Sequence, residues 1–194
     1  MRRVCVFCGS NRGGDPAYAA AAHAMGLALV RRGVELVYGG GKVGLMGVIA
    51  EAVMGAGGTV TGIMPDNLFR KEIGHTEVTD LRIVGSMHER KAMMAELSDA
   101  FVALPGGFGT FEEFCEAVTW TQLGLHAKPC GLLNVAGYYD ALLALFDRAE
   151  RDGFLIIEHR KLVHSATDPD ELLDHLETHP PVHTDKWIEG IEET

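Results

Sequence analysis

Two glycine-rich segments carry the residues whose types and spacing first suggest chemistry. A short apolar run at 36–38 leads into Gly39 to Gly47, and a second apolar run at 100–104 leads into Pro105 to Glu113. Glycines allow backbone N–H groups and a helix N-terminus to approach an anion closely. Both segments therefore predict an anion site, with a plain tight turn as the alternative for the first.

Neither segment fits the two best-known nucleotide motifs. Gly39-x-Gly41-x-x-Gly44 has the form of the dinucleotide fingerprint. It follows the second expected strand, however, and no acidic residue stands about 20 positions further on, at the end of the next strand. Lys42 lacks the Gly-Lys-Ser/Thr ending of a P-loop. An NAD-dependent oxidoreductase is therefore a weak interpretation.

A short charged segment, Ser86 to Lys91, lies between the two glycine segments. Ser86 and Glu89 have capping-box spacing, so we expect Glu89 to be structural. Arg90 falls on the apolar stripe of the same helical pattern, together with Met87, Met94 and Leu97. A buried charge needs a partner. Arg90 either holds a phosphate or a catalytic carboxylate at the mouth of a cleft, or reaches a surface carboxylate.

Glu113 has two interpretations that the local pattern leaves open. Thr110 and Glu113 fit a capping box, which would make Glu113 a helix cap. A carboxylate in the first turn beside an anion loop is also where a catalytic acid or transition-state stabiliser would lie. Glu112 lies near Glu116 at i+4 and is interpreted as solvated.

The elements that must position these residues alternate between short apolar runs and longer helical patterns. This order is typical of βαβ units and a parallel sheet. We expect an α/β fold with a Rossmann-like, doubly wound parallel sheet in a single domain, residues 1–178, followed by an extended tail, 179–194. The expected strands are 4–8, 34–38, 59–63, 100–104 and 130–133, with a further extended piece at 81–84. The expected helices are 16–32, 44–56, 87–97, 110–125, 138–151 and 169–177. Residues 65–79 form the longest irregular stretch, and such loops are often functional.

Composition narrows the classes of function. The 194 residues are 47% hydrophobic and 23% charged, as in ordinary globular domains. The net charge is −10, and residues 150–194 carry 12 acidic against 4 basic side chains, so binding to bulk nucleic acid is not expected. No apolar run approaches the roughly 20 residues of a membrane helix, and no signal peptide is seen, so we expect no membrane partner and a cytoplasmic location. Cys5 and Cys8 should point to opposite faces of a strand, as buried and reduced thiols.

The segments Gly39 to Gly47, Ser86 to Lys91 and Pro105 to Glu113 resemble the LOG ("lonely guy") family, the cytokinin riboside 5′-monophosphate phosphoribohydrolases. The resemblance extends over about residues 2 to 178. Such sequences are often labelled possible lysine decarboxylases. Amino-acid decarboxylation usually needs a pyridoxal Schiff-base lysine, and none of the six lysines lies in a recognisable cofactor motif.

The resemblance implies hydrolysis of a nucleoside 5′-monophosphate, such as AMP or a cytokinin riboside 5′-monophosphate, to the free base and ribose 5-phosphate, without a metal or organic cofactor. It implies Arg90 and Glu113 as the catalytic pair. Phe108 stands where Tyr is common in the family. The substrate contacts that it implies are Gly40, Gly41, Glu72, Met87, Lys91, Gly107, Phe108, Gly109, Thr110, Phe111, Glu112 and Thr119.

In such a reaction Glu113 would stabilise an oxocarbenium-like ribose or direct water onto it. We expect Arg90 to orient Glu113 and to lower its carboxyl pKa. A non-catalytic nucleotide-binding or carrier protein is the main alternative, since it would use the same loops without needing Glu113. A homodimer is expected as well, because the helix at 110–125 carries more apolar surface than one sheet face needs, from Phe111, Phe114, Val118, Trp120 and Leu125.

Overall fold

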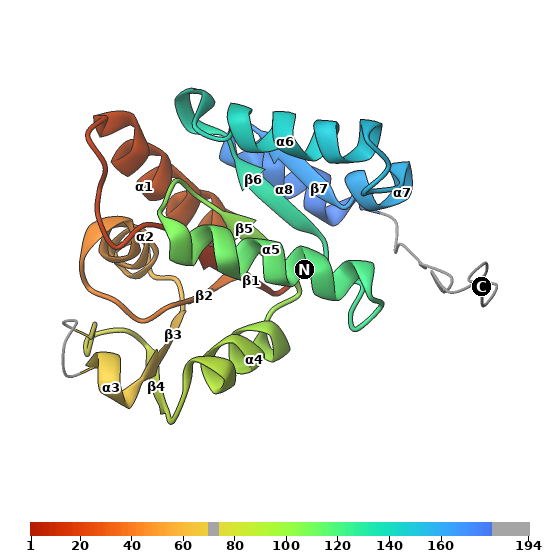
Figure 1. Ribbon diagram of the computed structural model, residues 1–194. Coiled ribbons are helices and arrows are strands. Elements are labelled where there is room, and N and C mark those ends of the chain that lie inside the picture. The colour runs from red at the N-terminus through yellow and green to blue at the C-terminus, as the bar shows by residue number, and fades with distance from the viewer. Residues whose placement is uncertain (70–73, 180–194) are drawn as a thin grey trace.

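A computed structural model describes residues 1–69 and 74–179 of the chain. Its centre is a parallel sheet of seven strands in the order β4-β3-β2-β1-β5-β6-β7 (Figure 1). The predicted Rossmann-like α/β fold is confirmed. The strands are β1 (Arg3–Phe7), β2 (Glu35–Tyr38), β3 (Val60–Pro65), β4 (Asp80–Val84), β5 (Ala100–Ala103), β6 (Cys130–Leu133) and β7 (Val163–Ala166).

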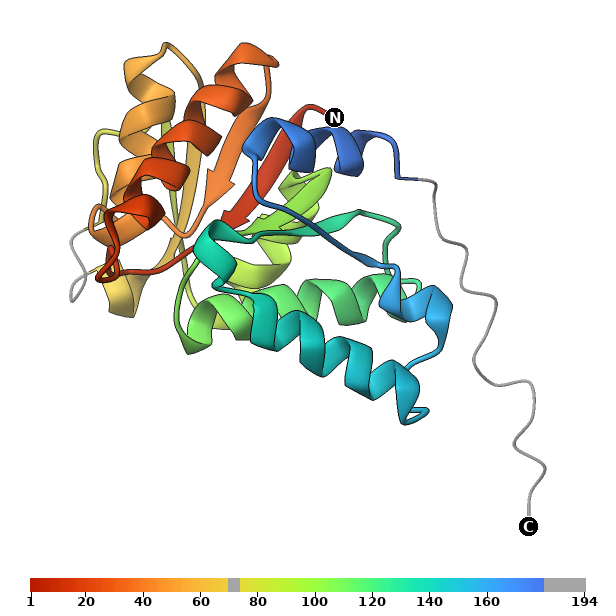
Figure 2. The same ribbon diagram turned by 90° about the horizontal axis from the view of Figure 1, so that it is seen from above.

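Helices cover both faces of the sheet, as Figure 2 shows from above. Helices α1, α2 and α8 pack on one face, where the core includes Met25, Ile49 and Leu172. Helices α4, α5 and α6 pack on the other face, around Phe101, Phe114 and Tyr139. The helices are α1 (Pro16–Arg31), α2 (Gly44–Gly55), α3 (Asp66–Phe69), α4 (Met87–Leu97), α5 (Phe108–Gln122), η1 (Val135–Gly137), α6 (Asp140–Arg151), α7 (Ile157–Arg160) and α8 (Pro169–Glu177).

Some elements differ from the sequence prediction. The extended piece at 81–84 is a full edge strand, β4, and the sequence pattern missed the opposite edge strand β7 and the short helices α3, η1 and α7. Strand β7 has the sequence Val-His-Ser-Ala, of which only Ala166 is buried, so it offers little apolar signal. Part of the stretch expected to be irregular, 65–79, is ordered against the first glycine loop. His75 N donates to Gly40 O at 2.9 Å, and Gly41 and Gly74 form an isolated bridge.

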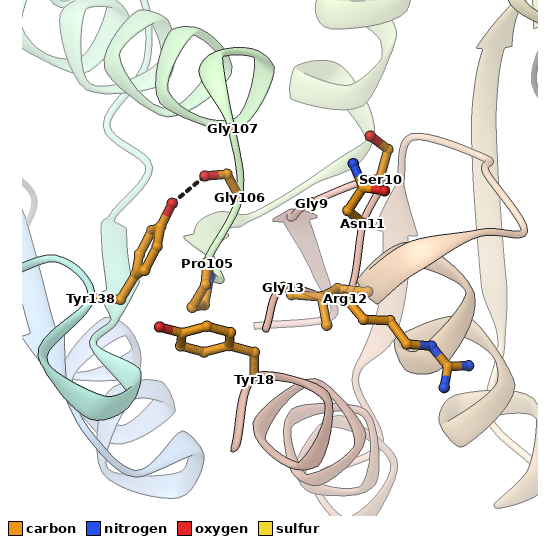
Figure 3. A pocket seen from close by; sticks show the side chains of 11 residues that line it. Gly9, Ser10, Asn11, Arg12, Gly13, Tyr18, Pro105, Gly106, Gly107 and Tyr138 are labelled. Atoms are coloured by element: carbon orange, nitrogen blue, oxygen red, sulfur yellow. Dashed lines mark hydrogen bonds between the residues drawn. The ribbon is translucent and has the colours of Figure 1, made fainter. Parts of the chain in front are cut away.

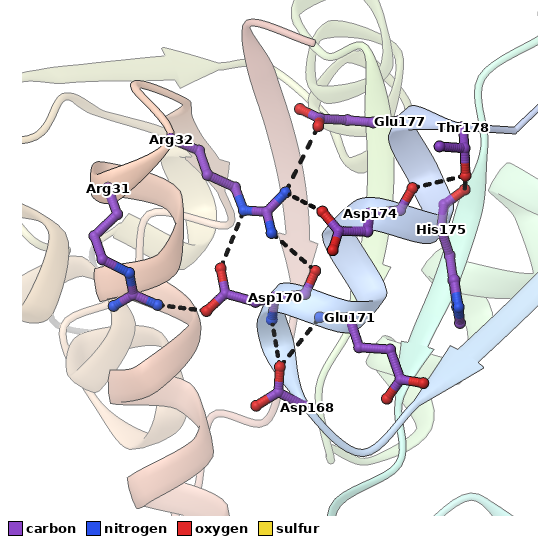
Figure 4. Close-up of polar contacts among 9 residues, drawn as sticks. All are labelled: Arg31, Arg32, Asp168, Asp170, Glu171, Asp174, His175, Glu177 and Thr178. Atoms are coloured by element: carbon purple, nitrogen blue, oxygen red, sulfur yellow. Dashed lines mark hydrogen bonds and ion pairs between the residues drawn. The ribbon is translucent and has the colours of Figure 1, made fainter.

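Helix α8 is fastened to α1 by a network of ion pairs (Figure 4). Arg32 reaches Asp170 at 3.1 Å and Asp174 at 2.7 Å, and Arg31 reaches Asp170 at 2.6 Å. The side chain of Asp168 caps the helix by accepting from two backbone N–H groups. The acidic segment that begins at residue 150 therefore folds as part of the domain up to residue 179. Residues 180–194 of the predicted tail lie outside the described residues.

Cys5 and Cys8 belong to different core clusters, one on each face of the sheet. Both are buried free thiols, as predicted. Within residues 1–69 and 74–179, no helix combines the length and the apolar character that crossing a bilayer requires.

Candidate active site

A cavity of about 240 Å³ opens at the carboxyl edge of the sheet. It lies where the strand order reverses between β1 and β5, the usual ligand position in doubly wound sheets. The loops after β1, β2 and β5 and helices α2 to α5 contribute its walls. The lining residues outside the sheet include Gly9, Ser10, Gly39, Met46, Leu68, Arg90, Gly107, Phe108, Gly109, Thr110 and Glu113.

Arg90 and Glu113 meet in this cavity. Arg90 Nη2 lies 3.5 Å from Glu113 Oε1, and the two side chains are only 12% and 11% exposed. The guanidinium packs against the α-carbon of Gly39 so closely that a Cβ there would collide with Nη2. Arg90 Nε is buried and has no hydrogen-bond partner among the described residues. The interpretation of Arg90 as the partner of a buried carboxylate in the cleft is the one that the geometry supports.

The start of α5 excludes one of the two interpretations of Glu113. The helix begins at Phe108, with Gly107 as its N-cap and no side-chain cap. The interpretation in which Thr110 caps the helix is wrong, because Thr110 is already the third helical residue and its hydroxyl packs against Gly106. Glu113 lies a turn later, where it cannot reach the N-cap. The capping box is therefore excluded, whereas the one at Ser86 is confirmed, with Ser86 Oγ accepting from Glu89 N at 3.1 Å.

Burial controls the electrostatics of Glu113. Removal from water raises its carboxyl pKa more than Arg90 lowers it, and the net pKa lies above the ordinary glutamate value. Arg90 lowers the pKa of Glu113, as predicted, but burial, which the sequence pattern did not reveal, outweighs it. A carboxylate in this environment is a stronger base than an exposed one.

The second predicted phosphate loop lines the cavity with several residues, whereas the first contributes only one of its glycines. Gly107, Gly109 and Thr110 line the cavity at the N-terminus of α5, and Phe108 stands at its mouth with 92% of its surface exposed. Gly40 and Gly41 face the 74–75 segment and do not line the cavity, to which their loop contributes Gly39.

The other predicted contacts lie around the cavity or away from it. Met87 is at its edge, with Sδ 3.8 Å from Arg90 Nη1. Phe111 packs on Tyr138 and Tyr139, in the core. Thr119 lines a separate groove between α5, α6 and α7. Lys91 and Glu112 pair with each other between α4 and α5. Glu72 lies outside the described residues.

Comparisons with known proteins assign the chain to a family. Residues 46–176 match the protein family described as "Possible lysine decarboxylase". A rice protein named probable cytokinin riboside 5′-monophosphate phosphoribohydrolase LOGL9 is 58% identical over 94% of this chain and 80% of its own length. Arabidopsis thaliana LOG3, named as the same kind of enzyme, is 50% identical over 94% of this chain and 85% of its own. The chain belongs to the LOG family.

Solved structures share the LOG fold at low identity. A molybdenum cofactor binding protein from Rippkaea orientalis superposes with a TM-score of 0.69 at 22% identity, covering 91% of this chain and 96% of that one. The Chlamydomonas reinhardtii molybdenum cofactor carrier protein superposes with a TM-score of 0.68 at 21% identity, with the same coverage. These likenesses describe the fold alone.

The loop after β1 is the part of the LOG site that the sequence analysis missed. Gly9 and Ser10 line the cavity and also a neighbouring cavity of about 180 Å³, whose other walls include Tyr18 and Tyr138 (Figure 3). Tyr138 Oη donates to Gly106 O at 2.5 Å. The available signal was the turn-forming run Gly9-Ser10-Asn11 directly after the first strand.

Proposed function

We propose that this LOG-family chain hydrolyses the N-glycosidic bond of a nucleoside 5′-monophosphate, releasing the free base and ribose 5-phosphate. The observation that carries the proposal is the buried Arg90–Glu113 pair, which shares one cavity with the uncapped N-terminus of α5. The names of the relatives support the same reaction. AMP and cytokinin riboside 5′-monophosphates are the proposed substrates, and the decarboxylase description is only the label of the family.

The N-terminus of α5 supplies the phosphate site. The first N–H groups of a helix have no intrahelical acceptor, and here no side chain of residues 1–69 and 74–179 caps them. These donors and the helix dipole favour a dianionic phosphate. We assign the phosphate to Gly107, Gly109 and Thr110, with Phe108 against the rest of the nucleotide. The predicted contacts of Glu72 and Thr119 stay predictions.

The Arg90–Glu113 pair supplies the chemistry. As the C1′–N bond breaks, positive charge develops on the ribose, and the Glu113 carboxylate stabilises it or accepts a proton from the attacking water. Arg90 fixes the orientation of Glu113, and its unpaired Nε is a donor for a substrate oxygen. The phosphate anchors the sugar, so binding energy remote from the reacting atoms serves to position it.

The test of the function is the release of adenine from AMP, followed by chromatography, with adenosine as the matched substrate that lacks the phosphate. We expect AMP to be cleaved and adenosine to be a far poorer substrate, because charge-assisted contacts to the phosphate are lost. AMP binding without release of adenine would favour the carrier alternative. Equal cleavage of adenosine and AMP would contradict the phosphate site.

A homodimer is part of the proposal. Phe114 is buried in the subunit's own core, and so contributes nothing to a dimer surface. Leu125 is exposed, and so are the apolar side chains that make up the exposed apolar surface of residues 123–157, after α5, on α6, between α6 and α7, and at the start of α7: Leu123, Leu145, Phe154, Ile156 and Ile157. We propose this surface as the contact, and a monomer by light scattering at micromolar concentration would contradict it. The cytoplasmic location stays a prediction, which fractionation of cells would test.

A further inference from the structure

Lys91 forms a second charged contact between the two helices that carry the catalytic pair. It follows Arg90 directly on α4, yet its side chain crosses to α5. Nζ lies 2.5 Å from Glu112 Oε1 and 3.0 Å from Glu116 Oε1. The Lys91 side chain is only 12% exposed. Its ammonium is thus held by two carboxylates one helical turn apart.

Neighbouring residues of α4 contact neighbouring residues of α5. Two consecutive cations of α4, Arg90 and Lys91, face α5, and Glu113 lies between Glu112 and Glu116 in sequence. Arg90 and Lys91 share one turn of α4, so a shift of the α4 backbone at Lys91 also moves Arg90. Glu116 is the more buried of the two carboxylates that hold Lys91, whereas Glu112 is half-exposed, so solvent screens the Glu116 contact less.

We propose that Glu116, acting through Lys91, is a positioning residue for the hydrolysis, and that this contact holds α4 against α5 so that Arg90 stays at Glu113. The inference rests on the proposed function in taking Glu113 as the catalytic carboxylate. It gives Lys91 a role that does not require contact with the nucleotide.

The side chains of the Lys91 contact also affect the pKa of Glu113. Arg90 and Lys91 from α4 lower its pKa, and Glu112 and Glu116 from α5 raise it. Lys91 itself stays charged: burial alone lowers its pKa, but the hydrogen bonds that it donates to Glu112 and Glu116 outweigh burial and raise the pKa.

Cys5 in β1 and Cys8 directly after β1 also interact electrostatically with Glu113. Burial raises the pKa of both thiols, so they remain neutral. Beside the effect of burial, the charged side chains that act on Glu113 therefore come from α4 and α5. Removing Lys91 leaves the like charges of Glu112 and Glu116 uncompensated, while removing the charge of Glu116 takes one like charge away.

Removing Lys91 and neutralising Glu116 should shift the pKa of Glu113 in opposite directions. A simple loss of packing between α4 and α5 would not produce opposite shifts. We would measure the pH profile of kcat/KM for AMP with Lys91→Met and Glu116→Gln. The acidic limb should move to higher pH in Lys91→Met and to lower pH in Glu116→Gln, each by about one pH unit or less. Both variants should also lower kcat at the pH optimum more than they change KM, since the orientation of the catalytic pair is loosened.

Asp174→Asn is the matched control, because it removes a carboxylate from an ion-pair network on the other face of the sheet. It should leave the pH profile in place. Thermal unfolding of each variant checks that the fold is retained. If Lys91 contacts only the nucleotide, Lys91→Met raises KM without moving the acidic limb, and the proposal is wrong. Shifts of the same sign in the two variants would also overturn it.

A readout independent of catalysis keeps the proposal separate from the proposed function. Carbon-13 NMR of protein labelled at the glutamate carboxyl carbon, with Glu113→Gln to assign the resonance, follows the ionisation of Glu113 directly. Opposite shifts of this titration in Lys91→Met and Glu116→Gln support the positioning contact even in a protein that releases no adenine. An unmoved titration refutes it even in an active enzyme.

Discussion

Glu113→Gln is the sharpest test of the catalytic assignment. Glutamine has nearly the same shape as glutamate and can still accept a hydrogen bond from Arg90, so the substitution removes charge and little else. Because Gly107 is the N-cap residue of α5 and Glu113 is the sixth helical residue, the change should not disturb the start of the helix.

The magnitude follows from the burial of the site. A carboxylate about 4 Å from a unit positive charge, at an effective dielectric constant of about 20, interacts with it by about 4 kcal/mol. The charge that develops on the ribose is partial, so we expect a loss of about 3 kcal/mol of transition-state stabilisation. That corresponds to a decrease in kcat of about 100-fold.

The assay measures adenine release under saturating AMP, together with AMP affinity by calorimetry. Affinity should change little, since the phosphate is bound at the N-terminus of α5. A Glu113→Gln protein with wild-type kcat would refute the reasoning and make the carrier alternative the better interpretation. Loss of AMP binding together with loss of activity would instead place Glu113 in binding.

The remaining predictions concern the same pair of residues. Arg90→Ala should lower kcat and raise KM, and the double variant with Glu113→Gln should lose less than the sum of the two free energies, because either change disables the pair; the four-protein kinetic cycle measures this. Gly39→Ala should reproduce much of the Arg90→Ala defect, because a Cβ at Gly39 would collide with the guanidinium of Arg90. Gly55→Ala is the control, since Gly55 lies on the open surface of α2 and a Cβ there meets nothing. Near-normal kcat/KM in Gly39→Ala would contradict the contact. The raised pKa of Glu113 means that its charged form is disfavoured in the folded state, so its contribution to stability is complete below the ordinary glutamate pKa and is lost as the pH rises through the raised value. The melting temperature of Glu113→Gln relative to wild type should therefore rise between acidic and neutral pH, and a constant difference across that range would show that the pKa is not raised.

The sequence by itself determined the fold class and indicated the candidate residues for the chemistry. Alternating apolar runs and helical patterns are local properties, and they predicted six of the strands and the long helices to within a few residues. The two glycine segments and the segment from Ser86 to Lys91 were enough to indicate the family. Few residue types fit these positions, because some need a glycine where a backbone approaches closely and others need a side chain that can do the chemistry.

Tertiary structure alone decided how those residues meet. Whether Thr110 and Glu113 form a capping box depended on where α5 begins: the helix starts at Phe108, before Thr110, and Thr110 packs against Gly106. The direction of the pKa of Glu113 depended on burial, which no local spacing reveals. Gly9 and Ser10 joined the site because β1 pairs with β5, nearly a hundred residues away. Such contacts arise from the order of strands in the sheet, and local periodicity carries no information about that order.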